Sequence, residues 1–176
     1  SVHSFPTRRS SDLGECLNCG CIPSKALLKA GEMRKVIENL EQFGMQSAEM
    51  PEVNDPLKVV REKVDLINGP KTMKTFDKVD LVLGQGDAEF VDPHTVRVGG
   101  KDYKGKKIFI ATGTEPMIPP IEGLDQVEKL TNVNLFEQKE IPESLMIIGG
   151  GAIGSEMAQA FSRLGSKVIV AHMDLH

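Results

Sequence analysis

The sequence contains no tryptophan, a single tyrosine and only three cysteines among its 176 residues. A platform of Trp and Tyr side chains on which nucleic-acid bases could stack is therefore missing. Long hydrophobic runs are missing too, since no apolar stretch approaches the ~20 residues that a membrane-spanning helix needs. Three cysteines, an odd number, do not make the disulfide framework of a small secreted protein. We therefore expect neither a membrane-spanning protein nor a secreted disulfide scaffold.

A strong excess of charge is also absent. The chain has 21 Lys and Arg against 25 Asp and Glu, a formal net charge of −4, and neither sign is clustered. With 40% hydrophobic and 26% charged residues, the composition is that of an ordinary globular chain. We expect no nucleic-acid partner, no membrane partner and a cytoplasmic location, with one domain or two incomplete ones.

The first residues differ from the rest of the chain. Residues 1–13 show no helical or strand period and run abruptly into an organised segment. Within them, SFPTRRSSDL looks like the translated read-through of a sequencing-library adapter, and the alternative is a natural basic arm. The apolar stretch of a secretory signal does not follow the two arginines. We expect residues 1–13 to be a non-native leader and exclude them from the fold prediction.

The hydrophobic pattern predicts helices first, strands next and a strand–helix–strand unit last. Apolar or small residues at spacings of three and four predict one helix that begins near Pro23 and ends at Gly44. A second helix is expected after the cap residue Asp55, beyond a polar loop over 46–54. Strands are expected over 79–83, 89–91, 95–98, 101–103, 107–112, 145–148 and 168–171, and a third helix over 152–164.

The three cysteines all lie within six residues, at the start of the first predicted helix. A helix N-terminus lowers the pKa of a thiol, and the thiolate is the species that attacks disulfides and binds soft metals. Residues five positions apart lie ~140° apart around a regular helix. Pairing of Cys16 with Cys21 therefore requires the Cys16 end to be non-helical, and Gly20 and Pro23 suit that bend.

Two other interpretations of the cysteines stay open at this point. A metal- or redox-sensing binding module would use Cys16, Cys19 and Cys21, but a fourth ligand is not nearby, since His94 and His172 lie far along the chain. The second alternative is a cluster of small buried apolar side chains. We expect redox chemistry and no metal.

The segment Gly14 to Leu28 resembles the redox-active stretch of the flavin-dependent pyridine nucleotide–disulfide oxidoreductases, among them dihydrolipoamide dehydrogenase, mercuric reductase and glutathione reductase. The family pattern G-G-x-C-x-N-x-G-C-[IV]-P-S-K stands here as LGECLNCGCIPSK. Leu13 replaces the first glycine, and Cys19 replaces an apolar or aromatic residue. The resemblance implies that Cys16 and Cys21 are catalytic and form a redox disulfide, with Cys16 facing the substrate and Cys21 facing the flavin.

The resemblance continues along the chain. A strand pair that begins near Ala88 looks like the pair beside the FAD adenine, where the family requires a small side chain. The segment IFIATGTEP resembles the motif that closes the FAD domain. The FAD contacts that the resemblance implies are Gly14, Glu15, Lys25, Ala88, Ala111, Thr112 and Gly113.

The segment GGGAIGSE follows a predicted strand and opens a predicted helix. In its G-x-G-x-x-G pattern, Gly149 permits the tight turn, Gly151 lets a pyrophosphate approach the backbone, and Gly154 allows close helix–strand packing. This context predicts NAD or NADP binding, and the alternative is a plain glycine-rich turn. The predicted contacts are Gly149, Gly150, Gly151, Ala152, Ile153, Gly154, Ser155, Glu156 and His172.

His172 stands where the next strand usually ends in an acidic residue that binds the ribose 2′-OH. A histidine cannot accept that hydroxyl as a carboxylate does, and a protonated one would suit a 2′-phosphate. NADPH is therefore predicted at least as strongly as NADH. The alternative is that His172 merely ends a strand in solvent.

The resemblance implies an α/β fold. It predicts an incomplete Rossmann-like FAD-binding domain with a small β-meander over 14–120, a crossover over 121–140 and the start of a second Rossmann-like, NAD(P)-binding domain over 141–176. The family's first FAD-binding strand would precede Gly14, and its interface domain would follow His176. We expect the chain by itself to be inactive.

The function that the resemblance implies is electron transfer between NAD(P)H, FAD and a Cys16–Cys21 disulfide, as in dihydrolipoamide dehydrogenase. The alternative within the family is NADPH-dependent reduction of Hg(II), as in mercuric reductase. The expected partner is a small-molecule or protein-bound disulfide, or Hg(II), and the parent enzyme is expected to be a homodimer.

Overall fold

The computed structural model describes residues 14–68, 74, 77–112 and 114–173, so the predicted leader lies outside the described residues. Its contacts divide the chain into two compact units. Among the described residues, unit 1 contains Gly14, Glu15 and those between Leu66 and Pro119, and unit 2 contains Cys16–Asp65 and those from Pro120 onward. The mixture of helices and strands agrees with the predicted α/β class. The predicted domain boundaries stay a prediction, because contact units and evolutionary domains need not coincide.

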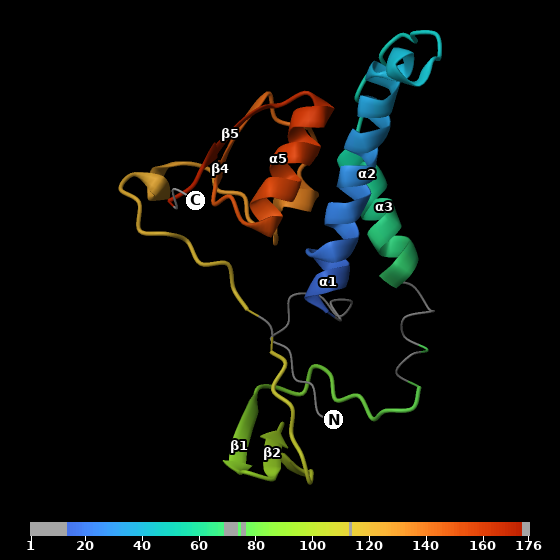
Figure 1. The fold of residues 1–176 in the computed structure, drawn as a ribbon. Coiled ribbons are helices and arrows are strands. Elements are labelled where there is room, and N and C mark those ends of the chain that lie inside the picture. The colour runs from blue at the N-terminus through green and yellow to red at the C-terminus, as the bar shows by residue number, and fades with distance from the viewer. Residues whose placement is uncertain (1–13, 69–73, 75–76, 113, 174–176) are drawn as a thin grey trace. The chain divides into compact units, whose positions relative to one another are not determined.

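Unit 1 is built on a three-stranded antiparallel meander of β1 (Ala88–Asp92), β2 (Thr95–Val98) and β3 (Lys101–Lys104), in the order β1-β2-β3. Figure 1 labels two of these strands. The turn between β2 and β3 is Gly99-Gly100, with φ values of 56° and 80° that favour glycine at both places. The predicted meander is thereby confirmed.

A small core holds this unit together. Val82, Val96 and Val98 are buried in it, and Tyr103 and Ile108 pack against them. Val96 and Val98 point to the same face of β2 because side chains alternate along a strand.

Two strand predictions in unit 1 are wrong. Residues 79–83 and 107–112 have irregular backbone in place of strands, and the Phe109 and Ile110 residues are 82% and 73% exposed. An apolar run shows only that a segment suits a sheet, whereas a strand also needs a neighbour that pairs with its backbone. Within the described residues these two segments have no such neighbour.

Unit 2 combines the helices α2 (Cys21–Glu38) and α3 (Pro56–Asn68) with a strand–helix–strand unit of β4 (Ser144–Ile148), α5 (Ala152–Leu164) and β5 (Lys167–Ala171). The two strands are parallel neighbours, as expected when a helix connects them (Figure 1). One core joins these elements, and its buried members are Leu27, Leu57, Val60, Leu135, Phe136, Met157, Ala160, Phe161 and Leu164.

The helix boundaries follow from capping chemistry. The Asp55 carboxylate accepts a hydrogen bond from the Lys58 backbone N–H at 2.7 Å, which confirms the predicted cap of α3. Helix α2 ends at Glu38, and a short 3₁₀ turn, η1 (Leu40–Phe43), carries the chain on to Gly44, whose φ is 73°. The α-helix therefore ends before the predicted stop, and Gly44 ends the 3₁₀ turn that follows it. Within the described residues, no helix is long and apolar enough to cross a membrane.

Helices α2 and α5 lie side by side (Figure 1). A Cβ atom on Gly31 of α2 would lie 3.2 Å from the Ala160 carbonyl oxygen of α5, so the helices approach closely at this glycine. One turn further along both helices, Arg34 Nη1 donates to the Arg163 carbonyl oxygen at 2.8 Å. From the first contact to the second, the chain moves three residues forward in both helices, so α2 and α5 run in the same direction. The cysteines and the glycine loop, which precede the two helices, therefore lie at the same end of the pair.

Candidate functional site

The cysteines lie at a break between two helical segments. A single helical turn, α1 (Glu15–Asn18), contains Cys16, and α2 begins at Cys21. Between them, Gly20 has φ −121° and ψ −119°, which are not helical values. The expectation that the Cys16 end is non-helical is therefore wrong. The bend lies between Cys16 and Cys21, at Cys19 and Gly20, and it removes the angular conflict that a continuous helix would impose.

The thiols of Cys16 and Cys21 interact directly. Neither is in a disulfide bond and both residues are exposed. The hydrogen bond from the neighbouring Cys16 and then its charge raise the pKa of the Cys21 thiol, while the nearby Lys25 ammonium lowers it. The direction is opposite to the lowering expected from a helix N-terminus. A second thiol within hydrogen-bond reach outweighs the cation, because two thiolates so close together would repel each other.

Cys19 has a different environment from its two neighbours. It is half-buried, and its sulfur receives a long hydrogen bond of 3.8 Å from the side-chain amide Nδ2 of Asn132. Asn132 lies in the segment that leads toward β4, far away in the sequence. The third cysteine is thus held by a second part of unit 2.

Lys25 and Glu156 link the two predicted sites. Lys25 Nζ lies 2.5 Å from Glu156 Oε1, with α2 supplying the lysine and α5 the glutamate. The resemblance assigned Lys25 to FAD, and the glycine pattern assigned Glu156 to the nicotinamide dinucleotide. Sequence reasoning missed their contact, because the residues are 131 positions apart and no pattern connects them.

The glycine loop between β4 and α5 is closely packed at Gly154 and open at Gly151. Gly149 has φ 109°, and its N–H donates to the Ala171 carbonyl oxygen at 2.8 Å. A Cβ atom on Gly154 would lie 1.9 Å from the Gly149 carbonyl oxygen, whereas one on Gly151 would meet nothing within 4 Å. Close packing at Gly154 and open space at Gly151 are what a pyrophosphate at a helix N-terminus requires. The loop therefore fits a dinucleotide.

The other loop residues frame this opening. Ser155 donates its backbone N–H to the Gly151 carbonyl oxygen at 2.9 Å and its hydroxyl to the Gly150 carbonyl oxygen at 3.0 Å. Ala152 begins α5, and Ile153 is 69% exposed beside it. Hydrogen bonds from Ser155 to the loop thus fix the first turn of α5, and the side chain of Ile153 remains exposed to solvent.

His172 contacts the glycine loop from the end of β5. Its Nδ1 accepts a hydrogen bond from the Gly150 N–H at 3.1 Å. Its ring atom Cγ would lie 3.3 Å from a Cβ atom on Gly150, so the ring lies against this glycine. With Nδ1 acting as acceptor, a neutral imidazole carries its proton on Nε2.

Unit 1 contains predicted FAD contacts that the structure describes. Ala88, in β1 opposite Val98, is exposed, and so are Ala111 and Thr112 in irregular backbone. Small, exposed positions of this kind leave space for a ligand. Gly14 is exposed with φ 98°. Gly113 lies outside the described residues, as does the side chain of Glu15.

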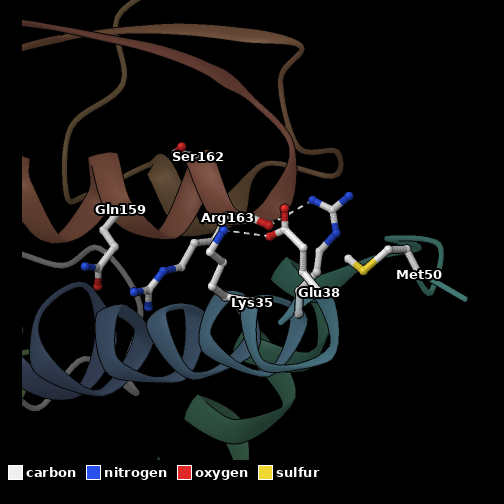
Figure 2. Close-up of a pocket in the computed structure, with 7 residues that line it drawn as sticks. Lys35, Glu38, Met50, Gln159, Ser162 and Arg163 are labelled. Carbon is white, nitrogen blue, oxygen red and sulfur yellow. Dashed lines mark hydrogen bonds and ion pairs between the residues drawn. The ribbon is translucent and has the colours of Figure 1, made fainter. Parts of the chain in front are cut away.

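A cleft of about 560 Å³ lies between α2 and α5, beyond the Gly31 contact (Figure 2). Figure 2 shows Lys35 paired with Glu38, whose nitrogen and oxygen are 2.9 Å apart. None of the predicted site residues lines this cleft, and its lining residues belong to none of the motifs identified in the sequence. Its lining residues are Arg34, Lys35, Glu38, Met50, Gln159, Ser162 and Arg163.

The described residues do not favour a metal centre. Across 14–68, 74, 77–112 and 114–173, no three His, Cys, Asp or Glu side chains are grouped so that they could hold a metal ion. At the α1–α2 junction, the thiols of Cys16 and Cys21 lie within hydrogen-bond reach of each other.

A profile of the family described as "Pyridine nucleotide-disulphide oxidoreductase" matches residues 8–175. Among curated relatives, a mercuric reductase from Lysinibacillus sphaericus is 39% identical over 158 residues, which are 88% of this chain and 29% of that protein. A dihydrolipoyl dehydrogenase from Acholeplasma laidlawii is 36% identical over 169 residues, which are 91% of this chain and 49% of that protein.

Solved structures show the same similarity. The Cu(II) complex of the HOCl-induced flavoprotein disulfide reductase RclA from Escherichia coli has a TM-score of 0.72 at 28% identity, covering 96% of this chain and 35% of that chain. The chain thus spans between about a quarter and a half of the length of the proteins that it matches.

Proposed function

The chain belongs to the pyridine nucleotide-disulphide oxidoreductase family, and from this we propose that it carries the redox-active cysteine pair of a flavoprotein disulfide oxidoreductase. The observation that carries the proposal is the interaction between the Cys16 and Cys21 thiols, side by side at the break between α1 and α2. A pair of thiols that can close into a disulfide and reopen is the working group of such an enzyme.

Cofactors would supply the electrons. When bound, FAD and NAD(P)H deliver the electron pair that opens the disulfide. On the protein side, the glycine loop, with Gly151 open and Gly154 closely packed, supports binding of the dinucleotide phosphates. The proposed FAD contacts are Gly14, Glu15, Lys25, Ala88, Ala111, Thr112 and Gly113.

The two thiols would have different roles in the reaction. We assign Cys16 to attack on the substrate disulfide, which breaks that bond, forms a mixed disulfide and releases one substrate thiolate. Cys21 then attacks the sulfur of Cys16, so that the Cys16–Cys21 bond forms and the second substrate thiolate leaves. Lys25 favours the Cys21 thiolate, because its positive charge lowers the pKa of that thiol.

The proposed substrate is a small or protein-bound disulfide, as in dihydrolipoamide dehydrogenase. Mercuric reductase-like reduction of Hg(II) with NADPH is the second candidate. It is favoured by the 39% identity to a mercuric reductase and by His172 at the place of an acidic residue. The candidate from a different class is a metal- or redox-sensing binding module that uses Cys16, Cys19 and Cys21.

The choice between NAD and NADP rests on His172. Its Nδ1 accepts the Gly150 N–H, so a neutral imidazole has its own N–H donor at Nε2. An N–H donor at this position favours the 2′-phosphate of NADP, whereas a carboxylate would favour the 2′-hydroxyl of NAD. We also propose a homodimer, as the resemblance implies, and a cytoplasmic location, since reactive thiols persist in reducing compartments.

The flavin spectrum of the full-length protein tests this function. Cys21→Ser is expected to abolish the long-wavelength absorbance that a thiolate beside a flavin produces, whereas Cys16→Ser is expected to retain it. The reverse pattern would exchange the two roles. Purified protein that holds stoichiometric zinc and no flavin would replace the enzyme with the metal-binding alternative.

A further inference from the structure

The third cysteine offers chemistry that the proposed function does not use. Cys19 directly follows α1, three residues after Cys16 and two before Cys21. All three sulfur atoms therefore belong to one short segment that contains a backbone break. Cys19 is half-buried, whereas the other two are exposed.

The break makes Cys16 the better partner for Cys19. Residues three apart on a helix have Cα atoms ~5 Å apart, within the ~4.4–6.8 Å that a disulfide spans. One more residue of helical backbone after Asn18 would bring Cys19 into this relation with Cys16. Cys21 is separated from Cys19 by Gly20 alone, and so short a ring strains a disulfide. A bond between Cys16 and Cys19 is thus the favoured alternative.

Asn132 contacts Cys19 and would oppose this movement. Its side-chain amide donates to the Cys19 sulfur across 3.8 Å. The segment that carries Asn132 is itself fixed, because the side-chain oxygen of Asn134 accepts the Thr131 N–H at 2.7 Å. The donor is therefore held in place by local backbone structure, and Cys19 is held by that donor.

We propose that Cys19 is a third redox thiol that exchanges with the Cys16–Cys21 disulfide, and that Asn132 restrains this exchange. This inference rests on the proposed function, because it requires that disulfide to form. The Cys19 thiolate attacks the Cys16 sulfur, the Cys16–Cys21 bond breaks and a Cys16–Cys19 bond forms. Cys21 leaves as a thiolate and takes up the proton that Cys19 lost. The number of disulfide bonds does not change, so no oxidant or reductant is needed.

The exchange would switch the enzyme off reversibly. A Cys16–Cys19 bond removes the thiol that attacks the substrate and leaves Cys21 reduced. Attack of Cys21 on Cys16 restores the original pair. The position of this equilibrium depends on how firmly Cys19 is held.

Disulfide mapping of the oxidised protein tests the proposal. The protein is oxidised with one equivalent of diamide, quenched in acid, alkylated and analysed by mass spectrometry of its peptides. In the parent protein, Cys16–Cys21 is expected as the main bond, with a minor Cys16–Cys19 species. Asn132→Leu is expected to raise the ratio of Cys16–Cys19 to Cys16–Cys21 by about fivefold, the factor that corresponds to a hydrogen bond of about 1 kcal/mol.

Three controls keep the outcomes distinct. Asn132→Asp has nearly the same shape without the amide donor and is expected to raise the ratio too, whereas Val133→Ala, on the exposed neighbouring residue, is expected to leave it unchanged. In concentrated urea the effect of Asn132 on this ratio should disappear.

Complete alkylation of Cys19 in every variant would overturn the exchange proposal, and so would a ratio insensitive to Asn132. Failure of the proposed function would be seen separately, as absence of the Cys16–Cys21 bond in Cys19→Ser.

Discussion

The cysteine turn (residues 16–21) and the glycine loop (residues 149–154) lie at the same end of α2 and α5, but one acts through side chains and the other through backbone. The cysteine turn presents exposed side chains on a broken helix. The glycine loop presents backbone, and at Gly154 it excludes even a methyl group. Chemistry by side chains tolerates local bending, whereas binding by backbone depends on close packing. Substitutions should therefore damage the loop through stability and the turn through reactivity.

The largest expected effect is that of Gly154→Ala. The added methyl carbon would lie 1.9 Å from the Gly149 carbonyl oxygen, so β4 and α5 must separate. We expect a loss of about 3 kcal/mol in the free energy of unfolding in urea, together with loss of NADPH binding measured by calorimetry.

Gly151→Ala is the matched control for this substitution. Its Cβ atom would meet nothing within 4 Å and its φ is −68°, so stability should change by less than about 0.5 kcal/mol. The dinucleotide should still bind more weakly, because the methyl group occupies the open space. Equal destabilisation by the two variants would contradict the packing argument.

His172→Glu is expected to have the next largest effect. A carboxylate accepts the ribose 2′-OH and repels a 2′-phosphate. The NADH to NADPH ratio of kcat/KM in the full-length protein should therefore move toward NADH by about 1–2 kcal/mol. His172→Gln, which adds no charge, should move it less. An unchanged ratio in both variants would show that His172 does not read the ribose.

Cys16→Ala sharpens the description of the cysteine turn. The substitution removes the hydrogen bond and the charge that raise the pKa of the Cys21 thiol, so this pKa should fall. Alkylation of Cys21 by iodoacetamide, followed against pH with Cys19→Ser in the background, should begin at lower pH. Lys25→Gln should act in the opposite direction, because it removes the cation that lowers the same pKa. Shifts of the same sign in both variants would contradict the assignment of causes.

The smallest expected effect is on the ion pair that joins the two regions. The side chains of Lys25 and Glu156 are 60% and 33% exposed, and exposed ion pairs contribute between about 0 and 1 kcal/mol. A double-mutant cycle with Lys25→Met and Glu156→Gln, read by urea unfolding, should give a coupling energy in that range. A coupling of several kcal/mol would mean that the pair stabilises the contact between α2 and α5.

Sequence reasoning succeeded where local signals determine the structure. Helix 152–164 and the strands beside it follow from periodicity, and Asp55 acts as the cap that its residue type predicts. Residues 107–112 failed, because their apolar pattern indicates a buried strand but cannot supply the neighbour that a strand requires. Local pattern therefore predicts an element only when its partners are also present.

In the candidate site, too, local signals were predicted correctly and contacts between distant residues were not. The family resemblance implied the pair of Cys16 and Cys21, and Gly20 was correctly expected to suit the bend, but the expectation that Cys16 itself is non-helical was wrong. The contact between Asn132 and Cys19 joins residues 113 positions apart, and only tertiary structure creates it. The raised pKa of Cys21 likewise depends on where the folded chain places a second thiol.

The central claim is that Cys16 and Cys21 are the redox pair, and peptide mapping of the oxidised protein tests it most directly. The protein would be oxidised under mild conditions, alkylated, digested and analysed by mass spectrometry without reduction. The account predicts a Cys16–Cys21 bond in most molecules, with Cys19 recovered as the alkylated thiol. A dominant bond from Cys19 to either of the other cysteines would contradict it.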